Sequence, residues 1–544
     1  MGSQQSTRSV WQVTNELPAF SAEPLLAQLA QFRETTYIIE DQQTGHIGVS
    51  LAQHGKLLGE QQQSADNRFI VIGVLPRLYP EWLGERSFNE THGVRFPYIA
   101  GEMAQGISSP QMVIAMARAG MLGMYGAGGL PMTQVEKDIQ VIQSALAEQA
   151  LPWGVNLIHS PQEPQLEQQA VALFLKYGVQ CISASAFMRI AKSVVHFACK
   201  GLRKDPAGHI LRPHRVLAKV SRPELAERFM SPAPQKILQD LLNDNLITEQ
   251  EAALAAVLPV AEDITVEADS GGHTDSRPLP AMLAGILVLR DQLVAQYGYT
   301  RPLRIGAAGG LGTPNAVAAA FAMGAAYVVT GSINQATVEA NQSALVKALL
   351  SKQDVADVAM APAGDMFEIG AEVQVAKRGC LFAQRGKKLH DIYKSHAGLH
   401  ALSAELRARL ETEIFRDSLD NIWQQTKSFW LQRQPDTVAK ADTDAKHKMA
   451  LIFRWYLGYS SIWARQGEAD RQTDFQIWCG PAMGAFNRWV KGSFLEPLQN
   501  RDVVQIAHNL LEGAALVTRA QQLRSYGVPI PMQAFNFKPR PLSG

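Results

Sequence analysis

The chain has 544 residues and a net charge of +1 at pH 7, and 46% of its residues are hydrophobic against 19% charged. This length predicts two or three domains rather than one core. A nearly neutral chain without a long basic run argues against nucleic-acid binding. The most lipid-like run, Met449 to Trp463, contains Arg454 and is too short to span a bilayer. We therefore expect no membrane segment.

The cysteines and the N-terminus indicate a cellular compartment. The four cysteines are scattered without a C-x-x-C pair, which is typical of free thiols in a reducing compartment. Residues Met1 to Arg8 are polar and no apolar run follows them, so no signal peptide is expected. Together these features predict a cytoplasmic protein.

Three regions follow one another along the chain. Residues 1–90 predict a small α+β domain, with strands at 36–40 and 69–74 and a helix at 25–32. Residues 91–340 alternate short apolar runs with helical segments. Residues 341–544 are mainly helical in pattern and more aromatic. We interpret this last region as a helical domain that packs against the middle one.

The middle region has the pattern of an α/β protein. Eight strand–helix units occur over roughly 240 residues, the size of one (β/α)8 TIM barrel. A polar helical insertion is predicted at about 222–258. A doubly wound sheet is the alternative, and it is less favoured because no G-x-G-x-x-G motif follows any strand. The predicted strands lie at 98–101, 121–125, 153–158, 179–185, 215–220, 303–308 and 326–330, with one more that begins at Asp263.

The strand that begins at Asp263 leads into the most informative stretch. It carries the acidic residues Glu267 and Asp269 and runs into Gly271, Gly272 and His273. In a TIM barrel the carboxyl ends of the strands carry the active site, and paired glycines let the backbone approach a ligand closely. His273 is therefore a candidate active-site residue. The alternative is a surface histidine after a Gly-Gly turn.

Two later loops are candidates for binding a phosphate. Gly309 and Gly310 follow one strand, and Gly331 and Ser332 follow the next. TIM barrels often bind phosphate at the loops after strands seven and eight, where backbone N–H groups and a helix N-terminus favour an anion. We expect a phosphorylated cofactor, with its reactive ring over the barrel mouth.

Two further polar residues end strands at the same mouth. Lys219 lies inside an apolar strand, where it is costly to bury unless it meets an anion, although a lysine at the barrel edge can also reach water. Asn156 can pair with a heterocycle edge or equally with backbone groups. His390, His396 and His400 lack a carboxylate at metal-site spacing, so no metal site is expected.

Long motifs in order carry a resemblance to a known family. They are Ala218 to Arg222, Glu267 to Asp275, Gly324 to Gln335, and Trp478 to Asn487. The barrel region resembles the nitronate monooxygenase-like flavin barrels. From about residue 90 to 530 the chain is similar, more specifically, to the PfaD-type FMN-dependent enoyl reductases of polyunsaturated fatty acid and polyketide synthases.

The resemblance implies cofactors and residue roles. It implies bound FMN and NADPH as electron donor. Gly309, Gly310, Gly331 and Ser332 would hold the phosphate, Asn156 and Lys219 would face the isoalloxazine, and Gly271 and Gly272 would line the cofactor site. His273 matches the family's active-site histidine, and Lys219 would act with it in catalysis.

The resemblance also implies an activity and partners. The expected reaction is reduction of trans-2-enoyl thioesters on an acyl carrier protein, with hydride passing from NADPH through FMN. The alternative activity is a nitronate monooxygenase-type flavin oxygenase. The wider family suggests a homodimer, and the sequence leaves the oligomeric state open. The basic cluster Lys377, Arg378, Arg385, Lys387 and Lys388 is a candidate docking patch for an acidic carrier protein, with a plain solvated face as the alternative.

Overall fold

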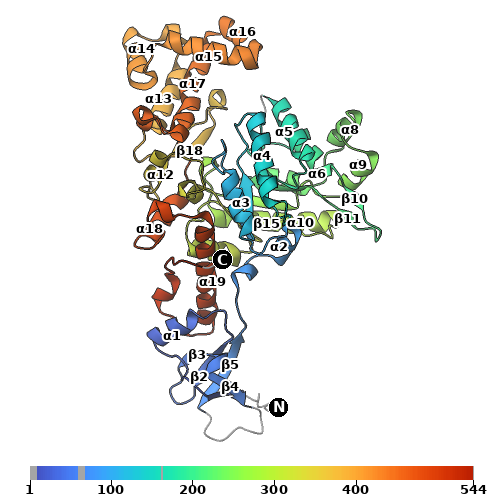
Figure 1. Ribbon diagram of the computed structural model, residues 1–544, viewed down its shortest axis with the longest axis vertical. Coiled ribbons are helices and arrows are strands. Elements are labelled where there is room, and N and C mark those ends of the chain that lie inside the picture. The colour runs from blue at the N-terminus through green and yellow to red at the C-terminus, as the bar shows by residue number, and fades with distance from the viewer. Residues whose placement is uncertain (1–8, 59–67, 161–162, 543–544) are drawn as a thin grey trace.

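The computed structural model describes residues 9–58, 68–160 and 163–542. The expectation at Met1 to Arg8, that no signal peptide is present, lies outside these residues. Figure 1 shows three parts: a β-sheet at one end, a barrel beside the middle, and a group of helices at the other end. Helix α19 (Val503–Ser525) joins the middle of the molecule to the terminal sheet.

The middle part is a closed barrel of eight parallel strands, in the order β12-β13-β15-β16-β6-β7-β8-β9. This confirms the predicted TIM barrel. Nearly every residue of these strands is buried, as expected for parallel strands covered by helices. The strands are β6 (Tyr98–Ala100), β7 (Leu122–Tyr125), β8 (Gly154–Ile158), β9 (Cys181–Ser185), β12 (Arg215–Val220), β13 (Asp263–Glu267), β15 (Arg304–Ala308) and β16 (Val328–Thr330).

The barrel helices complete the α/β alternation. The predicted insertion at 222–258 contains three helices. Helix α7 packs on β12 and α10 and belongs to the ring of barrel helices. Helices α8 and α9 pack on α6 and form the part that extends beyond the ring. The helices are α2 (Arg86–His92), α3 (Pro110–Arg118), α4 (Met132–Leu146), α5 (Pro164–Lys176), α6 (Lys192–Cys199), α7 (Pro223–Met230), α8 (Gln235–Asn243), α9 (Glu249–Ala255), α10 (Leu279–Tyr297) and α11 (Pro314–Ala322). A two-stranded hairpin, β10 (Arg203–Lys204) with β11 (Ile210–Leu211), lies beside them.

Helix α10 is long and apolar enough to cross a membrane, with a mean hydropathy of 1.2 and 17% of that window buried. One such helix is weak evidence for a membrane role. Its position in the chain, between β13 and β15 of the closed barrel, and its packing on β13, β15 and α7 identify it as a ring helix.

The N-terminal part is a five-stranded antiparallel sheet in the order β3-β2-β5-β1-β4. The predicted strands at 36–40 and 69–74 and the predicted helix are all present. Leu25 and Ile38 pack against Ala520 and Leu523 of α19, so the C-terminal helix covers the sheet. The elements are β1 (Val10–Val13), α1 (Ala22–Leu29), β2 (Thr36–Asp41), β3 (Ile47–Leu51), β4 (Gly55–Leu58) and β5 (Phe69–Leu75).

The region after the barrel is helical, as predicted, but it also contains a small sheet that the sequence patterns did not indicate. Strands β17 (Val358–Pro362) and β18 (Glu372–Ala376) form a hairpin, and β18 pairs with β14 (Gly272–His273) from the barrel mouth. The helices are α12 (Ala344–Leu350), α13 (Phe382–Ser395), α14 (Ala404–Leu410), α15 (Leu419–Arg433), α16 (Pro435–Thr443), α17 (Ala445–Gln466), α18 (Ala482–Val490) and α19.

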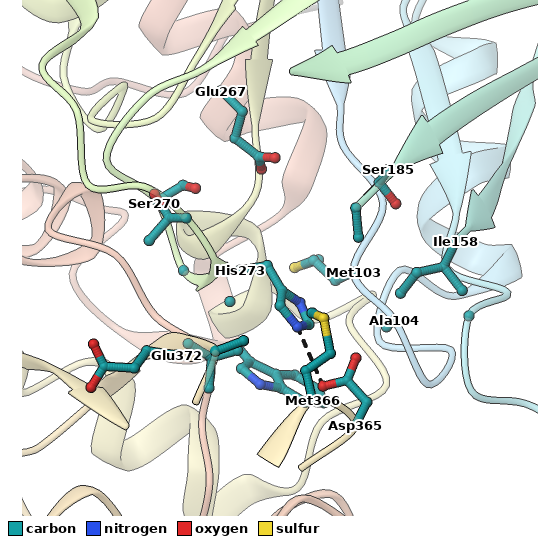
Figure 2. Close-up of a pocket in the computed structure, with 18 of the residues that line it drawn as sticks. Met103, Ala104, Ile158, Ser185, Glu267, Ser270, His273, Asp365, Met366 and Glu372 are labelled. Atoms are coloured by element: carbon teal, nitrogen blue, oxygen red, sulfur yellow. Dashed lines mark ion pairs between the residues drawn. The ribbon is translucent and has the colours of Figure 1, made fainter. Parts of the chain in front are cut away.

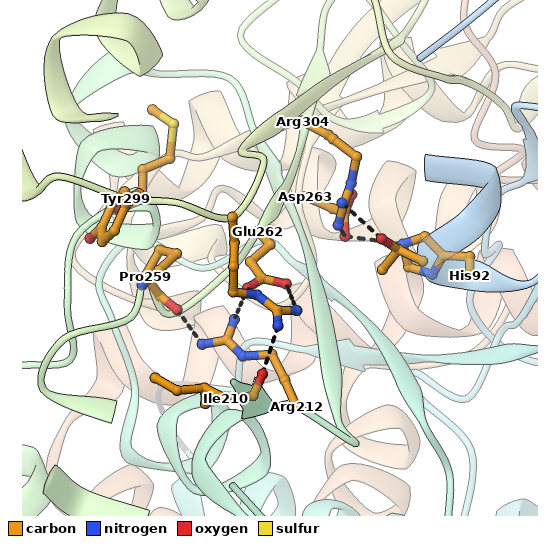
Figure 3. Close-up of polar contacts among 11 residues, drawn as sticks. His92, Ile210, Arg212, Pro259, Glu262, Asp263, Tyr299 and Arg304 are labelled. Carbon is orange, nitrogen blue, oxygen red and sulfur yellow. Dashed lines mark hydrogen bonds and ion pairs between the residues drawn. The ribbon is translucent and has the colours of Figure 1, made fainter. Parts of the chain in front are cut away.

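A buried charge network closes the amino-terminal end of the barrel (Figure 3). Asp263 at the start of β13 accepts two hydrogen bonds from Arg304, at 2.6 and 2.9 Å, and lies 3.0 Å from His92 Nε2. Burial works against the ionised carboxylate, but the charge of Arg304 and then that of His92 outweigh it, and they hold the pKa of Asp263 well below its ordinary value. The network ties α2 to β13 and β15.

Replacing Arg304 by Met should destabilise the protein, because it leaves the Asp263 carboxylate in the barrel base without its main partner. Removing one partner of a buried pair costs about 3–5 kcal/mol. Thermal unfolding of the intact chain measures the loss. Arg86→Met is the control, because Arg86 pairs with Glu90 on the surface and its side chain is 91% exposed. Equal unfolding temperatures of the two variants would contradict the role of Arg304.

The same pair predicts a pH dependence of stability. The pKa of Asp263 is lower in the folded than in the unfolded state, so its ionisation stabilises the fold above about pH 4, and this stabilisation is lost as the pH falls below that value. Between about pH 6 and pH 3 the unfolding temperature of wild type should therefore fall more steeply than that of Arg304→Met. Parallel curves would show that Asp263 does not carry this dependence.

Candidate active site

A cavity of about 1690 Å³ opens at the carboxyl ends of the barrel strands. The barrel supplies one wall, and the β17–β18 hairpin with helices α15 and α17 supplies the other. Pockets for a single small ligand are roughly 300–1,000 Å³, so this cavity has room for a cofactor and a substrate together. Figure 2 shows His273 and Glu267 from the barrel facing Asp365 and Met366 from the hairpin.

Lys219 lies at the mouth between two carboxylates. Its Nζ is 2.8 Å from Glu267 and 3.2 Å from Glu102, and its side chain is 14% exposed. Burial favours the neutral amine, but the charges of Glu102 and Glu267 outweigh it and raise the pKa of Lys219. The lysine is therefore a buried ammonium with internal anionic partners, rather than an edge lysine that reaches water. Two of its three N–H groups are used, which leaves one donor for the cavity.

Asn156 lines the same cavity from β8. Its side-chain amide group donates to Ser185 Oγ at 2.8 Å and to the Ser183 carbonyl at 3.3 Å. The protein's own groups thus take both amide hydrogens, which fixes the orientation of the side chain. The Asn156 oxygen remains as an acceptor toward the cavity beside Gly128. The two alternatives for Asn156 therefore both hold in part. Its N–H groups pair within the protein, and its oxygen can still accept a hydrogen bond from a ligand.

His273 is held by the small sheet that joins the barrel to the later part of the chain. In β14, Gly272 pairs with Gln374 and His273 with Val373. Gln374 also donates from its side chain to Asp269 and to the Ser270 carbonyl, both at 2.7 Å. The loop that carries His273 is therefore clamped by β18. The imidazole is 33% exposed and faces the cavity.

The two glycine turns also open into this cavity. A Cβ atom added at Gly310 or at Gly331 would meet nothing within 4 Å, so both positions border open space. Gly309 and Gly310 have φ values of 88° and 72°, a left-handed backbone that favours glycine. The Ser332 hydroxyl accepts a hydrogen bond from the Gly480 N–H at 3.0 Å, so its own proton remains available to donate. These features fit a phosphate.

A later loop completes the phosphate side of the cavity. A Cβ at Gly271 would lie 2.7 Å from the backbone of Cys479, and one at Gly480 would lie 2.8 Å from the backbone of Gly271. The two backbones touch only because both residues are glycine. The 478–480 loop thus presses the Gly271–Gly272 turn against the barrel. Cys479, like the other three cysteines, is a buried free thiol.

Several buried polar atoms of the cavity wall lack a hydrogen-bond partner within the described part of the chain. They are Gln105 Oε1, Ser270 Oγ and Trp455 Nε1. Unpaired buried polar atoms are rare in native proteins and demand an explanation. A polar ligand in this cavity would pair with them. No group of three or more His, Cys, Asp or Glu residues suited to a metal ion occurs among the described residues.

Two pairings within the site were missed from the sequence. Glu102 follows the first barrel strand and Asp365 lies on the β17–β18 turn, and no local motif connects either residue with Lys219 or His273. In the basic cluster that was a candidate docking patch, three of the five side chains form ion pairs within the protein. Arg378 pairs with Asp357, Arg385 with Asp474 and Lys388 with Glu413, which favours the plain-surface alternative for these side chains.

The amino-acid sequence of the barrel matches the model of a known protein family. Residues 86–368, more than half of the chain, match the family model described as nitronate monooxygenase. The chain belongs to the nitronate monooxygenase family. This family is flavin-dependent, in agreement with the fit of the glycine turns to a phosphate. Residues 396–475 match a second model, described as the inserted helical domain of [acyl-carrier-protein] S-malonyltransferase.

Individual relatives within the nitronate monooxygenase family are more specific. The crystal structure of the enoyl reductase domain of MlnA, from the macrolactin biosynthesis cluster of Bacillus amyloliquefaciens, superposes with a TM-score of 0.77 at 38% identity, covering 82% of this chain and 99% of that one. The chain is therefore a flavin-type oxidoreductase homologous to enoyl reductases.

Two curated proteins are also similar. One of the polyunsaturated fatty acid synthase subunits of Thraustochytrium sp. is 45% identical over 450 residues, covering 81% of this chain and 30% of that protein. Polyketide biosynthesis protein PksE of Bacillus subtilis is 43% identical over 446 residues, covering 82% and 58%. The chain thus spans less than two thirds of the length of either relative.

Gly331→Leu should fold normally but lose flavin. The φ of Gly331, −125°, is open to other residues, and the new side chain would fill the space assigned to the phosphate. We expect the FMN dissociation constant to rise at least about tenfold, the equivalent of roughly 1.4 kcal/mol of binding, and the flavin absorbance of the purified protein to fall as a result. Gly285→Leu on the exposed face of α10 is the control, because a Cβ there also meets open space. Equal flavin content in both variants would contradict the assigned cradle.

Proposed function

We propose that the protein reduces the carbon–carbon double bond of trans-2-enoyl thioesters carried by an acyl carrier protein, with NADPH as reductant and FMN as bound cofactor. The reaction would serve polyunsaturated fatty acid or polyketide synthesis. The observation that carries the proposal is the single cavity shared by His273, Lys219 and both glycine turns, on a chain that is 38% identical to an enoyl reductase domain along 99% of that domain's length.

The residues that would hold FMN line one cavity at the barrel mouth. Gly309, Gly310, Gly331 and Ser332 would bind the phosphate, because the turns border open space and the Ser332 hydroxyl keeps a free proton. Gly271 and Gly272, the Asn156 oxygen and the remaining N–H of Lys219 would line the ring side. When bound, the flavin supplies hydride transfer to the β-carbon of the substrate.

His273 would complete the reduction by acting on the other carbon. Once the β-carbon has gained a hydride, the α-carbon must gain a proton, and a cationic imidazole can donate it. Burial favours the neutral ring, but Asp365 and then Glu267 outweigh it and raise the pKa of His273 above its ordinary value. The proton-donating form is therefore present near neutral pH.

The role of Lys219 differs from that of an isolated cation. With both carboxylates ionised, Lys219, Glu102 and Glu267 together sum to a net negative charge. The lysine therefore acts as a fixed hydrogen-bond donor, and its charge also offsets the repulsion between the two carboxylates. Ser183 donates to Glu102 at 2.9 Å and holds the arrangement from β9.

Replacing Lys219 by Met should weaken flavin binding, because the variant loses a charged donor and leaves Glu102 and Glu267 uncompensated. A hydrogen bond to a charged group contributes about 1.5–3 kcal/mol, so we expect the FMN dissociation constant to rise roughly tenfold to hundredfold. Fluorescence titration of the flavin-stripped protein measures it. Lys176→Met is the control, because Lys176 pairs with Glu136 on the surface. An unchanged constant would remove Lys219 from the cofactor site.

The proposed activity is tested against the nitronate oxygenase alternative, which the matched family model keeps open. Under anaerobic conditions wild type with FMN should oxidise NADPH when given a trans-2-enoyl thioester, and His273→Gln should do so about 10²–10⁴-fold more slowly, the range typical of general acid catalysis. Oxygen uptake on nitroalkanes should stay at background. The opposite pattern, with oxygen uptake and no enoyl reduction, would establish the alternative.

A further inference from the structure

Asp365 reaches the active site from outside the barrel. It lies on the turn between β17 and β18, and its Oδ1 is 3.4 Å from His273 Nε2 (Figure 2). The same hairpin also pairs with the backbone of His273 through β18. The β17–β18 hairpin therefore fixes the position of the imidazole and also supplies the carboxylate that faces it.

We propose that Asp365 is a positioning residue that keeps His273 protonated and aimed into the cavity for proton donation to the substrate. This inference rests on the proposed reduction of enoyl thioesters. The 3.4 Å separation is long for a hydrogen bond, so the interaction is mainly one of opposite charges. The carboxylate side chain is 58% exposed and the imidazole 33%, so water has access to the pair.

The other charged groups near His273 do not take the place of Asp365. Glu267 on β13 shares Lys219 of β12 with Glu102, at 2.8 Å from the lysine, and it raises the pKa of His273 less than Asp365 does. Arg454 on α17 pairs with Glu368 at 3.3 Å and acts on Asp365 only at longer range. Glu372 on β18 points away from the imidazole in Figure 2. Asp365 is therefore the negative charge that acts most strongly on His273.

The proton balance of the step is simple. The π bond between the α- and β-carbons breaks, the β-carbon gains a hydride that originates in the reduced nicotinamide, and the α-carbon gains the proton from His273. The N–H bond of the imidazolium breaks and leaves a neutral ring beside Asp365. Water then returns the proton, and the negative charge of Asp365 favours its uptake.

Asp365→Asn tests the inference through the pH profile. Because His273 acts in its protonated form, kcat for enoyl reduction falls as the pH rises through its pKa. Removing an adjacent opposite charge should move that fall to lower pH by about one pH unit. Asp365→Glu should restore the wild-type profile. Glu368→Gln is the matched control, since Glu368 lies in the same segment between β17 and β18, carries the same charge and pairs with Arg454 instead.

A second readout is independent of catalysis. Diethyl pyrocarbonate modifies a histidine in its neutral form and not as the imidazolium, so the pH dependence of modification at His273, followed by peptide mass spectrometry, reports its protonation directly. The Asp365→Asn curve should shift to lower pH by the same amount, whereas the Glu368→Gln curve should overlie that of wild type. A uniform loss of activity without a shift in either curve would indicate a merely structural role and would overturn the inference.

The two readouts separate this inference from the proposed function. If wild type reduces enoyl thioesters and the Asp365→Asn curves coincide with those of wild type, the reductase assignment stands and the role of Asp365 fails. If wild type reduces no enoyl thioester at any pH, the proposed function fails, and a shifted modification curve then still supports Asp365 as the group that sets the charge of His273.

Discussion

The backbone pairing between β14 and β18 is the constraint on which the site depends. Gly272 and His273 end a barrel loop, yet their hydrogen-bonding partners come from a hairpin that follows the barrel in sequence. A loop with two glycines is inherently mobile, and this pairing makes it a fixed edge of the cavity. The contact between Gly271 and the 478–480 loop adds a second restraint. The region after the barrel therefore forms part of the candidate active site.

Buried charges in this molecule are matched by short ion pairs at both ends of the barrel. At the base, Asp263 and Arg304 satisfy each other and fasten α2. At the mouth, Lys219 lies between two carboxylates, and its third N–H group remains to donate to a ligand. The physical rule is the same in both places, since a buried charge without a partner is costly. At the mouth, within the described part of the chain, polar atoms such as Gln105 Oε1 and Ser270 Oγ also lack a partner and border the cavity, which makes it a place for a ligand.

The fold was largely predictable from the sequence, and the site only in part. Buried parallel strands appear as short apolar runs, so all eight barrel strands were found at nearly their observed positions. Strands β17 and β18 were missed, because a short hairpin in a helical region has no strong periodic signal. Glycine turns are visible locally, whereas the pairing of Glu102 with Lys219, or of Asp365 with His273, depends on which distant segments the fold brings together.

The central claim is that a flavin lies across the barrel mouth, with its phosphate at the two glycine turns and its ring beside His273. A crystal structure of the FMN-loaded protein tests this most directly. The account predicts phosphate oxygens within hydrogen-bonding distance of the backbone nitrogens of Gly310 and Gly331, and the imidazole of His273 on the substrate side of the ring. A phosphate bound elsewhere, or a ring separated from His273 by the β17–β18 hairpin, would contradict it.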